Sequence, residues 1–212
     1  MLIMLKLGVL DLDGTLTNTA ILHLRAWQYA LIDLGLLDEV RSISIEYLLG
    51  RRAIDIATAL VGDGPQAWRL VRLKTMYYLE LLRNGLEPFP CAMELLDSTH
   101  EFGMRAAVVT SSSRSSALAV LKATRLLEKV DYVVAGDDVE KGKPDPLPIQ
   151  LALDRFNVEP KQAYGIGDTI YDVEAYRAAG LGLVMSLNPI NGAMHVKDLC
   201  EAINVIHAYI ES

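Results

Sequence analysis

Asp11-Leu12-Asp13-Gly14-Thr15-Leu16 is the most informative stretch of this chain, because two carboxylates follow an apolar run and a glycine comes next. Residues 6–11 have the character of a buried strand, which would deliver the carboxylates to the carboxyl edge of a sheet, where open α/β folds bind ligands. Two carboxylates on one face of an extended strand repel each other unless a cation lies between them. The stretch therefore predicts a metal site at the end of the first strand.

The composition is typical of one sizeable domain, or of one domain with an insertion, since 51% of the 212 residues are hydrophobic. A formal net charge of −7 argues against a nucleic-acid partner but leaves a small anionic substrate open. The apolar amino-terminal run is too short to span a bilayer and ends in two aspartates, so no membrane partner is expected. Cys91 and Cys200 lack metal-ligand spacing and are interpreted as reduced thiols of a cytoplasmic protein.

Residues 18–84 show helical periodicity and little sign of a strand. Residues 66–83 predict a long helix that Pro65 begins. The helical region ends at Glu87-Pro88-Phe89-Pro90, where two prolines forbid a continuing helix. The apolar stripe expected to pack inside this region, or between it and the remainder of the chain, consists of Leu24, Trp27 and Leu31.

After residue 90, short apolar segments alternate with helical ones. The expected strands are 104–110, 132–135, 163–166 and 181–185, with helices such as 115–127 and 148–156 between them. This alternation predicts an α/β fold with a parallel sheet and right-handed crossovers, which strand 6–11 should join. We therefore predict a Rossmann-like, doubly wound core of residues 1–16 and 91–212, and an inserted all-helical cap domain of residues 17–90.

Three later segments bring polar groups to the same edge of the sheet. Thr110-Ser111-Ser112-Ser113 leads from a strand into a helix, whose free N–H groups favour an anion. Lys141-Gly142-Lys143-Pro144 places a lysine in a rigid loop, and Gly167-Asp168-Thr169-Ile170-Tyr171-Asp172 adds two carboxylates. Each segment alone has an ordinary explanation as a helix cap or a solvated loop charge. Together they predict one site.

These four segments, in this order, resemble the four motifs of the haloacid dehalogenase superfamily, and the resemblance covers nearly the whole chain. The helical insertion resembles the α-helical cap of the phosphoglycolate phosphatase and β-phosphoglucomutase branch. The resemblance implies that Asp11 attacks phosphorus to form an aspartyl-phosphate, and that Asp13 serves as acid and base. It also implies that Mg²⁺ is held by the Asp11 carboxylate, the Asp13 backbone carbonyl and Asp168, with support from Asp172.

The same resemblance assigns the phosphate-binding groups. The Thr110 hydroxyl and the backbone N–H of Leu12 would bind phosphoryl oxygens, with Ser111 in the same turn. Lys143 would pair with Asp11 and with the phosphoryl oxygens, so that charge is neutralised on the side away from the metal.

Within this superfamily, the aspartate at position 13 favours phosphoryl transfer over C–Cl or C–P cleavage, because only an alkoxide leaving group needs its proton. His23, behind Thr17-Asn18-Thr19-Ala20, is similar to the cap opening of the mutases, whereas Gly167-Asp168 has the phosphatase form. The cap candidates for substrate contact are His23, Arg51 and Arg52.

We predict a Mg²⁺-dependent phosphatase that hydrolyses a small phosphorylated metabolite and is a monomer or a homodimer. A β-phosphoglucomutase-like sugar phosphate mutase is the alternative. A protein that binds a phosphorylated ligand without turnover is less favoured, because it would not need a nucleophile, a proton donor and metal carboxylates together.

Overall fold

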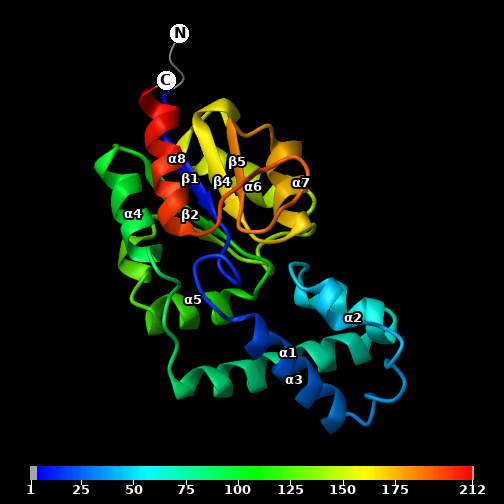
Figure 1. Cartoon of the computed structure of the whole chain (residues 1–212). Coiled ribbons are helices and arrows are strands. Elements are labelled where there is room, and N and C mark those ends of the chain that lie inside the picture. The colour runs from blue at the N-terminus through cyan, green and yellow to red at the C-terminus, as the bar shows by residue number, and fades with distance from the viewer. Residues whose placement is uncertain (1–3, 212) are drawn as a thin grey trace.

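The structure is a computed structural model that describes residues 4–211. The described chain forms a six-stranded parallel sheet in the order β3-β2-β1-β4-β5-β6 (Figure 1). The strands are β1 (Leu7–Leu10), β2 (Arg105–Val109), β3 (Tyr132–Val134), β4 (Ala163–Gly167), β5 (Leu183–Ser186) and β6 (Met194–His195). The strand order reverses at β1, which pairs with both β2 and β4. The crevice outside the carboxyl end of β1 is therefore a natural ligand site.

Helices cover both faces of the sheet, and this confirms the predicted doubly wound α/β fold. One face carries α4 (Ala92–Glu101), α5 (Arg114–Ala123) and α8 (Leu199–Glu211), which contribute buried residues such as Leu96, Val120 and Ile206. The other face carries α6 (Leu147–Phe156) and α7 (Ile170–Ala179), which contribute Ile149 and Tyr176. All four residues of β1 are buried, as expected of a strand covered on both sides.

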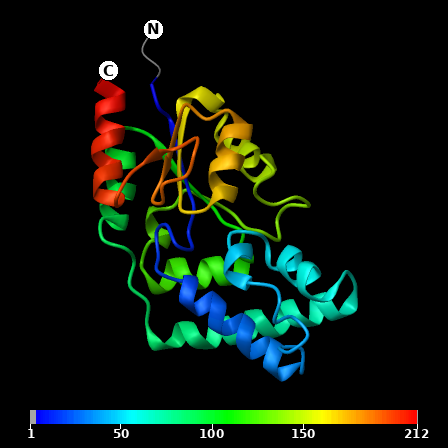
Figure 2. The same cartoon turned by 45° about the vertical axis from the view of Figure 1, so that its right-hand side comes forward.

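A helical bundle lies between β1 and β2 in the sequence. It consists of α1 (Ala20–Asp33), α2 (Ala53–Val61) and α3 (Pro65–Leu81), and has a core of its own that includes Trp27, Leu31, Ile56 and Leu70. Figures 1 and 2 place this bundle below the sheet, on the side where β1 ends. We refer to it below as the cap.

Single turns of 3-10 helix complete the secondary structure. They are η1 (Ile45–Leu48), η2 (Leu82–Asn84), η3 (Leu127–Lys129) and η4 (Pro160–Gln162). The expected helix over 115–127 ends early, at Ala123, because Arg125 adopts a left-handed backbone conformation with φ of 60°. The short strand β6 was not predicted, since Met194 and His195 are exposed and give no apolar pattern.

Cys91 and Cys200 form a disulfide with 5.3 Å between their Cα atoms, so the interpretation of both as reduced thiols is wrong. They lie 109 residues apart, and their pairing follows from the packing of α4 against α8. Disulfides persist mainly in oxidising compartments and in intracellular proteins of hyperthermophiles. The cysteines therefore no longer support a cytoplasmic location. Within residues 4–211, every helix is too short or too polar to cross a membrane.

Candidate active site

The loop after β1 carries the first two acidic residues to the sheet edge. Asp11 follows Leu10 directly and remains tied to the sheet, because its N–H donates to the carbonyl of Ile166 at 3.0 Å. Gly14 then turns the chain with φ of 93°, and a Cβ there would lie 2.4 Å from Oδ2 of Asp168. Only glycine combines that conformation with so close an approach.

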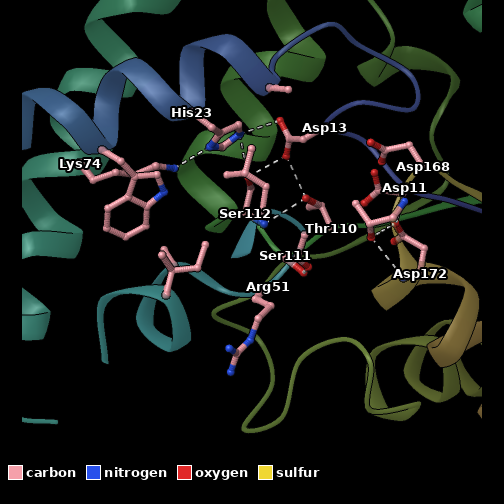
Figure 3. Close-up of a pocket in the computed structure, with 17 residues that line it drawn as sticks. Asp11, Asp13, His23, Arg51, Lys74, Thr110, Ser111, Ser112, Asp168 and Asp172 are labelled. Atoms are coloured by element: carbon pink, nitrogen blue, oxygen red, sulfur yellow. Dashed lines mark hydrogen bonds and ion pairs between the residues drawn. The ribbon is translucent and has the colours of Figure 1, made fainter. Parts of the chain in front are cut away.

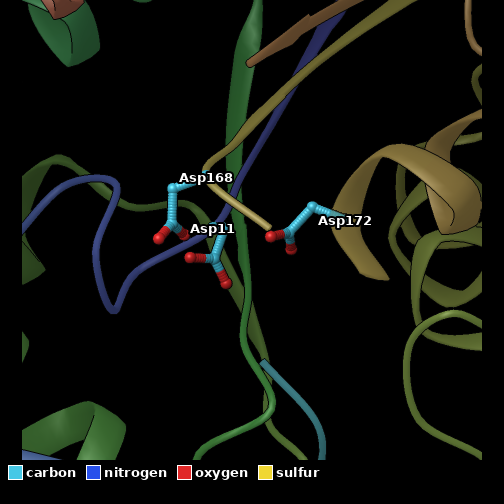
Figure 4. Close-up of side chains that lie close together, drawn as sticks. All are labelled: Asp11, Asp168 and Asp172. Carbon is cyan, nitrogen blue, oxygen red and sulfur yellow. The ribbon is translucent and has the colours of Figure 1, made fainter. Parts of the chain in front are cut away.

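Three carboxylates converge at this edge (Figure 4). One oxygen from each of Asp11, Asp168 and Asp172 lies within 4.8 Å of the others. Nζ of Lys143 lies 2.6 Å from Asp11 and 2.5 Å from Asp172, and it also donates to the carbonyl of Val109 at 3.1 Å. The structure thus brings together four residues that come from three separate segments of the sequence.

The cluster carries excess negative charge. Burial, and then the charge of Asp172, raises the pKa of Asp11 well above its usual value and that of Asp168 to about 7. Burial alone would lower the pKa of Lys143, but Asp11 and Asp172 hold it above its ordinary value. Three carboxylates face one ammonium, so the cluster has room for a further cation, and an all-oxygen donor set fits Mg²⁺.

Asp172 is held by the start of α7. Its Oδ2 accepts hydrogen bonds from the backbone N–H and the hydroxyl of Thr169, at 3.0 and 2.5 Å, in a capping box. Its other oxygen accepts from Lys143. With both oxygens engaged, Asp172 suits a supporting role. Because Thr169 caps the helix, the carboxylate of Asp168 remains directed to the cluster.

Asp13 faces away from the cluster, toward the cap. Its two carboxylate oxygens accept five hydrogen bonds, from Thr19 at 2.7 Å, His23 at 3.0 Å, Tyr78 at 3.1 Å, Ser112 at 2.7 Å and Thr110 at 3.2 Å. Burial would raise the pKa of Asp13, but His23 and the hydroxyls of Thr19 and Ser112 hold it well below its usual range. The side chain is therefore a carboxylate in this arrangement. Only its backbone carbonyl is left for the predicted contact with a metal.

His23 is oriented by a lysine that the sequence analysis did not identify. Nζ of Lys74 lies 2.7 Å from Nδ1 of His23, so a charged Lys74 donates to Nδ1, and Nε2 then carries the proton donated to Asp13. Burial, and then the charge of Lys74, lowers the pKa of His23, and burial lowers that of Lys74 to about 8. Lys74 lies on the buried face of α3 together with Leu70 and Tyr78. A lysine at this spacing among apolar residues could have identified it as a functional candidate from the sequence.

The turn after β2 supplies hydroxyl groups. Thr110 and Ser112 donate to Asp13, while Ser111 donates to the backbone carbonyl of Gly50 in the cap at 2.6 Å. Ser113 caps α5 by accepting from the N–H of Ser116. The side chain of Leu12 is fully buried in the core, so only its backbone can serve the site.

These groups enclose a pocket of about 80 Å³ between the sheet edge and the cap (Figure 3). Asp11, Asp13 and Asp168 lie on the core side, and His23 and Arg51 line it from the cap.

Arg52, which was predicted to contact substrate, is absent from this lining. Its guanidinium donates to Asp55 at 2.8 and 2.7 Å and to the carbonyl of Val139 in the core at 2.7 Å. It therefore fastens the cap to the core.

Comparison with known proteins identifies relatives of this chain. A phosphoglycolate phosphatase from Nitrosospira multiformis is 32% identical over 207 residues, which cover 94% of this chain and 91% of the relative. Fructose-1-phosphate phosphatase YqaB from Escherichia coli is 32% identical over 182 residues, covering 83% and 93%. The crystal structure of CbbY from Rhodobacter sphaeroides with phosphate superposes with a TM-score of 0.81 at 25% identity, covering 93% of this chain and 96% of that one.

The model of the haloacid dehalogenase-like hydrolases matches residues 9–185, which include the acidic cluster, the hydroxyl turn and the buried lysine. The chain therefore belongs to the haloacid dehalogenase-like hydrolase family.

Proposed function

We propose that this protein is a Mg²⁺-dependent phosphatase that hydrolyses a small phosphate monoester through an aspartyl-phosphate on Asp11. One observation carries the proposal: Asp11 lies in an acidic cluster beside the buried Lys143, and Asp13 lines the same pocket with its carboxylate turned the other way. A nucleophile and a proton carrier thus occupy one pocket while their environments differ. The names of the relatives, which include a phosphoglycolate phosphatase and a fructose-1-phosphate phosphatase, support the same reaction class.

In the proposed first step, a carboxylate oxygen of Asp11 forms a bond to phosphorus while the bond from phosphorus to the leaving oxygen breaks. Asp13 donates a proton to the leaving oxygen, since an entering phosphate dianion raises its pKa and favours the protonated form. In the second step a water molecule attacks phosphorus, its proton passes to Asp13, and Asp11 is released with inorganic phosphate. Thr110 and Lys143 would stabilise the phosphoryl oxygens in both steps.

The proposal includes a Mg²⁺ site in the acidic cluster. Asp11 and Asp168 would hold Mg²⁺ with their carboxylates, Asp13 with its backbone carbonyl, and Asp172 would support them. Bound there, the ion would neutralise charge on the phosphoryl oxygens. The raised pKa values of Asp11 and Asp168, which reflect burial and the neighbouring charge of Asp172, favour a cation in this place.

A sugar phosphate mutase is the second candidate. Its support is the set of contacts from Thr19, His23 and Tyr78 that ties Asp13 to the cap, because a cap that orients the proton carrier can also admit a sugar hydroxyl as acceptor. A β-phosphoglucomutase from Clostridium difficile shares the fold with a TM-score of 0.85, at 19% identity.

We further propose that residues 17–90 act as a cap domain that closes over one phosphorylated metabolite, in a monomer or homodimer. A cytoplasmic setting stays a prediction.

The experiment is release of phosphate from a panel of phosphorylated compounds, with and without Mg²⁺. The panel contains 2-phosphoglycolate, fructose 1-phosphate, pyrophosphate and β-glucose 1-phosphate, and isomerisation of the last is followed separately. We expect Mg²⁺-dependent release that Asp11→Asn abolishes while circular dichroism stays unchanged. Isomerisation without release would favour the mutase. Neither reaction in the whole panel, or substantial release by Asp11→Asn, would overturn the proposal.

A further inference from the structure

Ser111 joins the pocket to the cap. It lines the pocket, and its hydroxyl donates at 2.6 Å to the backbone carbonyl of Gly50, next to the cap residue Arg51 (Figure 3). Its backbone N–H has no hydrogen-bond partner within residues 4–211. The same residue therefore carries one donor that is engaged with the cap and another that is free for a ligand.

The neighbours of Ser111 in the turn after β2 are engaged with the core. The hydroxyls of Thr110 and Ser112 donate to Asp13, and the N–H of Ser112 donates to the hydroxyl oxygen of Thr110. A phosphoryl oxygen that enters the turn can accept from the N–H of Ser111 without breaking a hydrogen bond of the chain. Because this N–H and the hydroxyl belong to one residue, a phosphoryl group that orders the backbone there also orders the donor that holds the cap.

The cap segment that receives this hydrogen bond lies directly against the core. We call residues 44–52 the cap loop. Gly50 has φ of 96°, and a Cβ there would lie 2.9 Å from Oγ1 of Thr169 and from Cδ2 of Tyr171, so glycine is required for the close approach. The hydroxyl of Tyr171 also donates to the carbonyl of Tyr47 at 3.0 Å. The core thus holds the cap loop both from Ser111 and from a residue that does not line the pocket.

We propose that Ser111 is a positioning residue that couples phosphoryl binding to closure of the cap, with its N–H donating to a phosphoryl oxygen while its hydroxyl holds the carbonyl of Gly50. Such coupling is reciprocal, so the closed cap strengthens phosphate binding by the same factor by which phosphate favours closure. One hydrogen bond predicts a factor of about three to ten. This inference rests on the proposed phosphatase function and deepens it, because it names how the same site controls its cap.

The test is hydrogen exchange at the backbone amides of the cap loop, with inorganic phosphate and Mg²⁺ as the probe, at a concentration that calorimetry shows to saturate the site. In the wild type we expect phosphate to slow the exchange about three- to tenfold. Ser111→Ala keeps the N–H and removes the hydroxyl, so it should abolish most of this slowing and weaken phosphate binding by the factor that is lost. Ser111→Thr, which retains a hydroxyl, should restore most of the effect.

Tyr171→Phe is the matched control. It also removes a hydroxyl that holds the cap loop, but it leaves the turn around Ser111 unchanged. Exchange in this variant should be faster both with and without phosphate, so that the ratio of the two rates stays at the wild-type value. Circular dichroism checks that each variant is folded.

Three results would overturn the inference. They are an absence of slowing by phosphate in the wild type, a wild-type ratio of exchange rates in Ser111→Ala, and a ratio in Tyr171→Phe that falls as far as in Ser111→Ala. The measurements do not depend on turnover. Coupling without release of phosphate from any compound would contradict the phosphatase function alone, whereas release without coupling would contradict this inference alone.

Discussion

Lys74 and His23 form a buried pair in the cap, with 2.7 Å between Nζ and Nδ1, and Nε2 of the same histidine lies 3.0 Å from Asp13. A charge on α3 thereby fixes which nitrogen of His23 carries the proton offered to Asp13. Asp13, the acid and base of the proposed reaction, belongs to the core, but residues of the cap thus orient its side chain.

Lys74→Met should raise the pKa of His23, because burial and the nearby charge of Lys74 both lower it and the substitution removes that charge. Without the donor at Nδ1, His23 can turn its proton away from Asp13, and we expect kcat to fall by roughly 10²-fold. Histidine signals in an NMR pH titration would report the pKa, and a His23→Gln protein would identify the signal among those of the 4 histidines. An unchanged His23 pKa in Lys74→Met would contradict this arrangement.

The sequence was sufficient to predict that side chains directly after the strands belong to the site. Asp11 and Asp168 could be brought together because parallel strands β1 and β4 are adjacent, and their carboxyl ends meet at one edge. Lys143 was expected at the same edge because of its rigid loop, but its pairing with Asp11 was implied only by the resemblance. The sheet topology thus determined most of the core side of the site.

The cap side could not be predicted to the same extent. The position of Lys74 depends on how α1 packs against α3, and no periodicity in the sequence gives that rotation. Trp27 was expected to pack in the cap core, which it does, but no pattern in the sequence shows that its indole N–H has no hydrogen-bond partner within residues 4–211. The Cys91–Cys200 disulfide likewise joins segments that only the tertiary fold brings together.

Metal removal should make stability fall with rising pH. In the metal-free protein the pKa of Asp168 is raised from 3.8 to about 7 by burial and Asp172. The folded state then binds this proton more tightly than the unfolded state, so the contribution is fully present below pH 3.8 and is lost as the pH rises to about 7. The loss is at most ~4 kcal/mol. Asp13, whose pKa is lowered, affects stability only at more acidic pH.

Urea unfolding with EDTA or with Mg²⁺ measures this effect. The gain from Mg²⁺ should be larger at pH 8 than at pH 5, because Asp168, whose pKa is raised to about 7, then carries charge that the ion neutralises. Asp168→Asn should show a flatter pH dependence and a smaller gain from the ion. Equal stabilisation by Mg²⁺ at the two pH values would refute the assignment of the cluster as a cation site.

The disulfide should contribute to stability rather than to catalysis. It closes a loop with a sequence separation of 109 residues, and we expect Cys200→Ser to lower the free energy of unfolding by about 2–4 kcal/mol. A reducing agent should have the same effect on the wild type and no further effect on the variant. Thiol titration under denaturing conditions should detect no free cysteine before reduction and both after it. Detection of two free thiols in the unreduced protein would rule out the bond.

Arg52 should influence all substrates alike, in contrast to Arg51. Its guanidinium bridges Asp55 in the cap and the Val139 carbonyl in the core, and its stem lies so close to Gly142 that a Cβ on that glycine would come within 2.5 Å of Cγ. Arg52→Met removes the bridge and keeps much of the stem, so we expect kcat/KM to fall about five- to tenfold for every ester, because cap closure is less favourable. Arg52→Lys, which lacks the planar fork, should recover only part of this loss. Arg51→Ala is the matched comparison: Arg51 lines the pocket, so we expect its effect on kcat/KM to differ from one ester to another. An effect of Arg52→Met that is confined to some of the esters would place Arg52 in the substrate site after all.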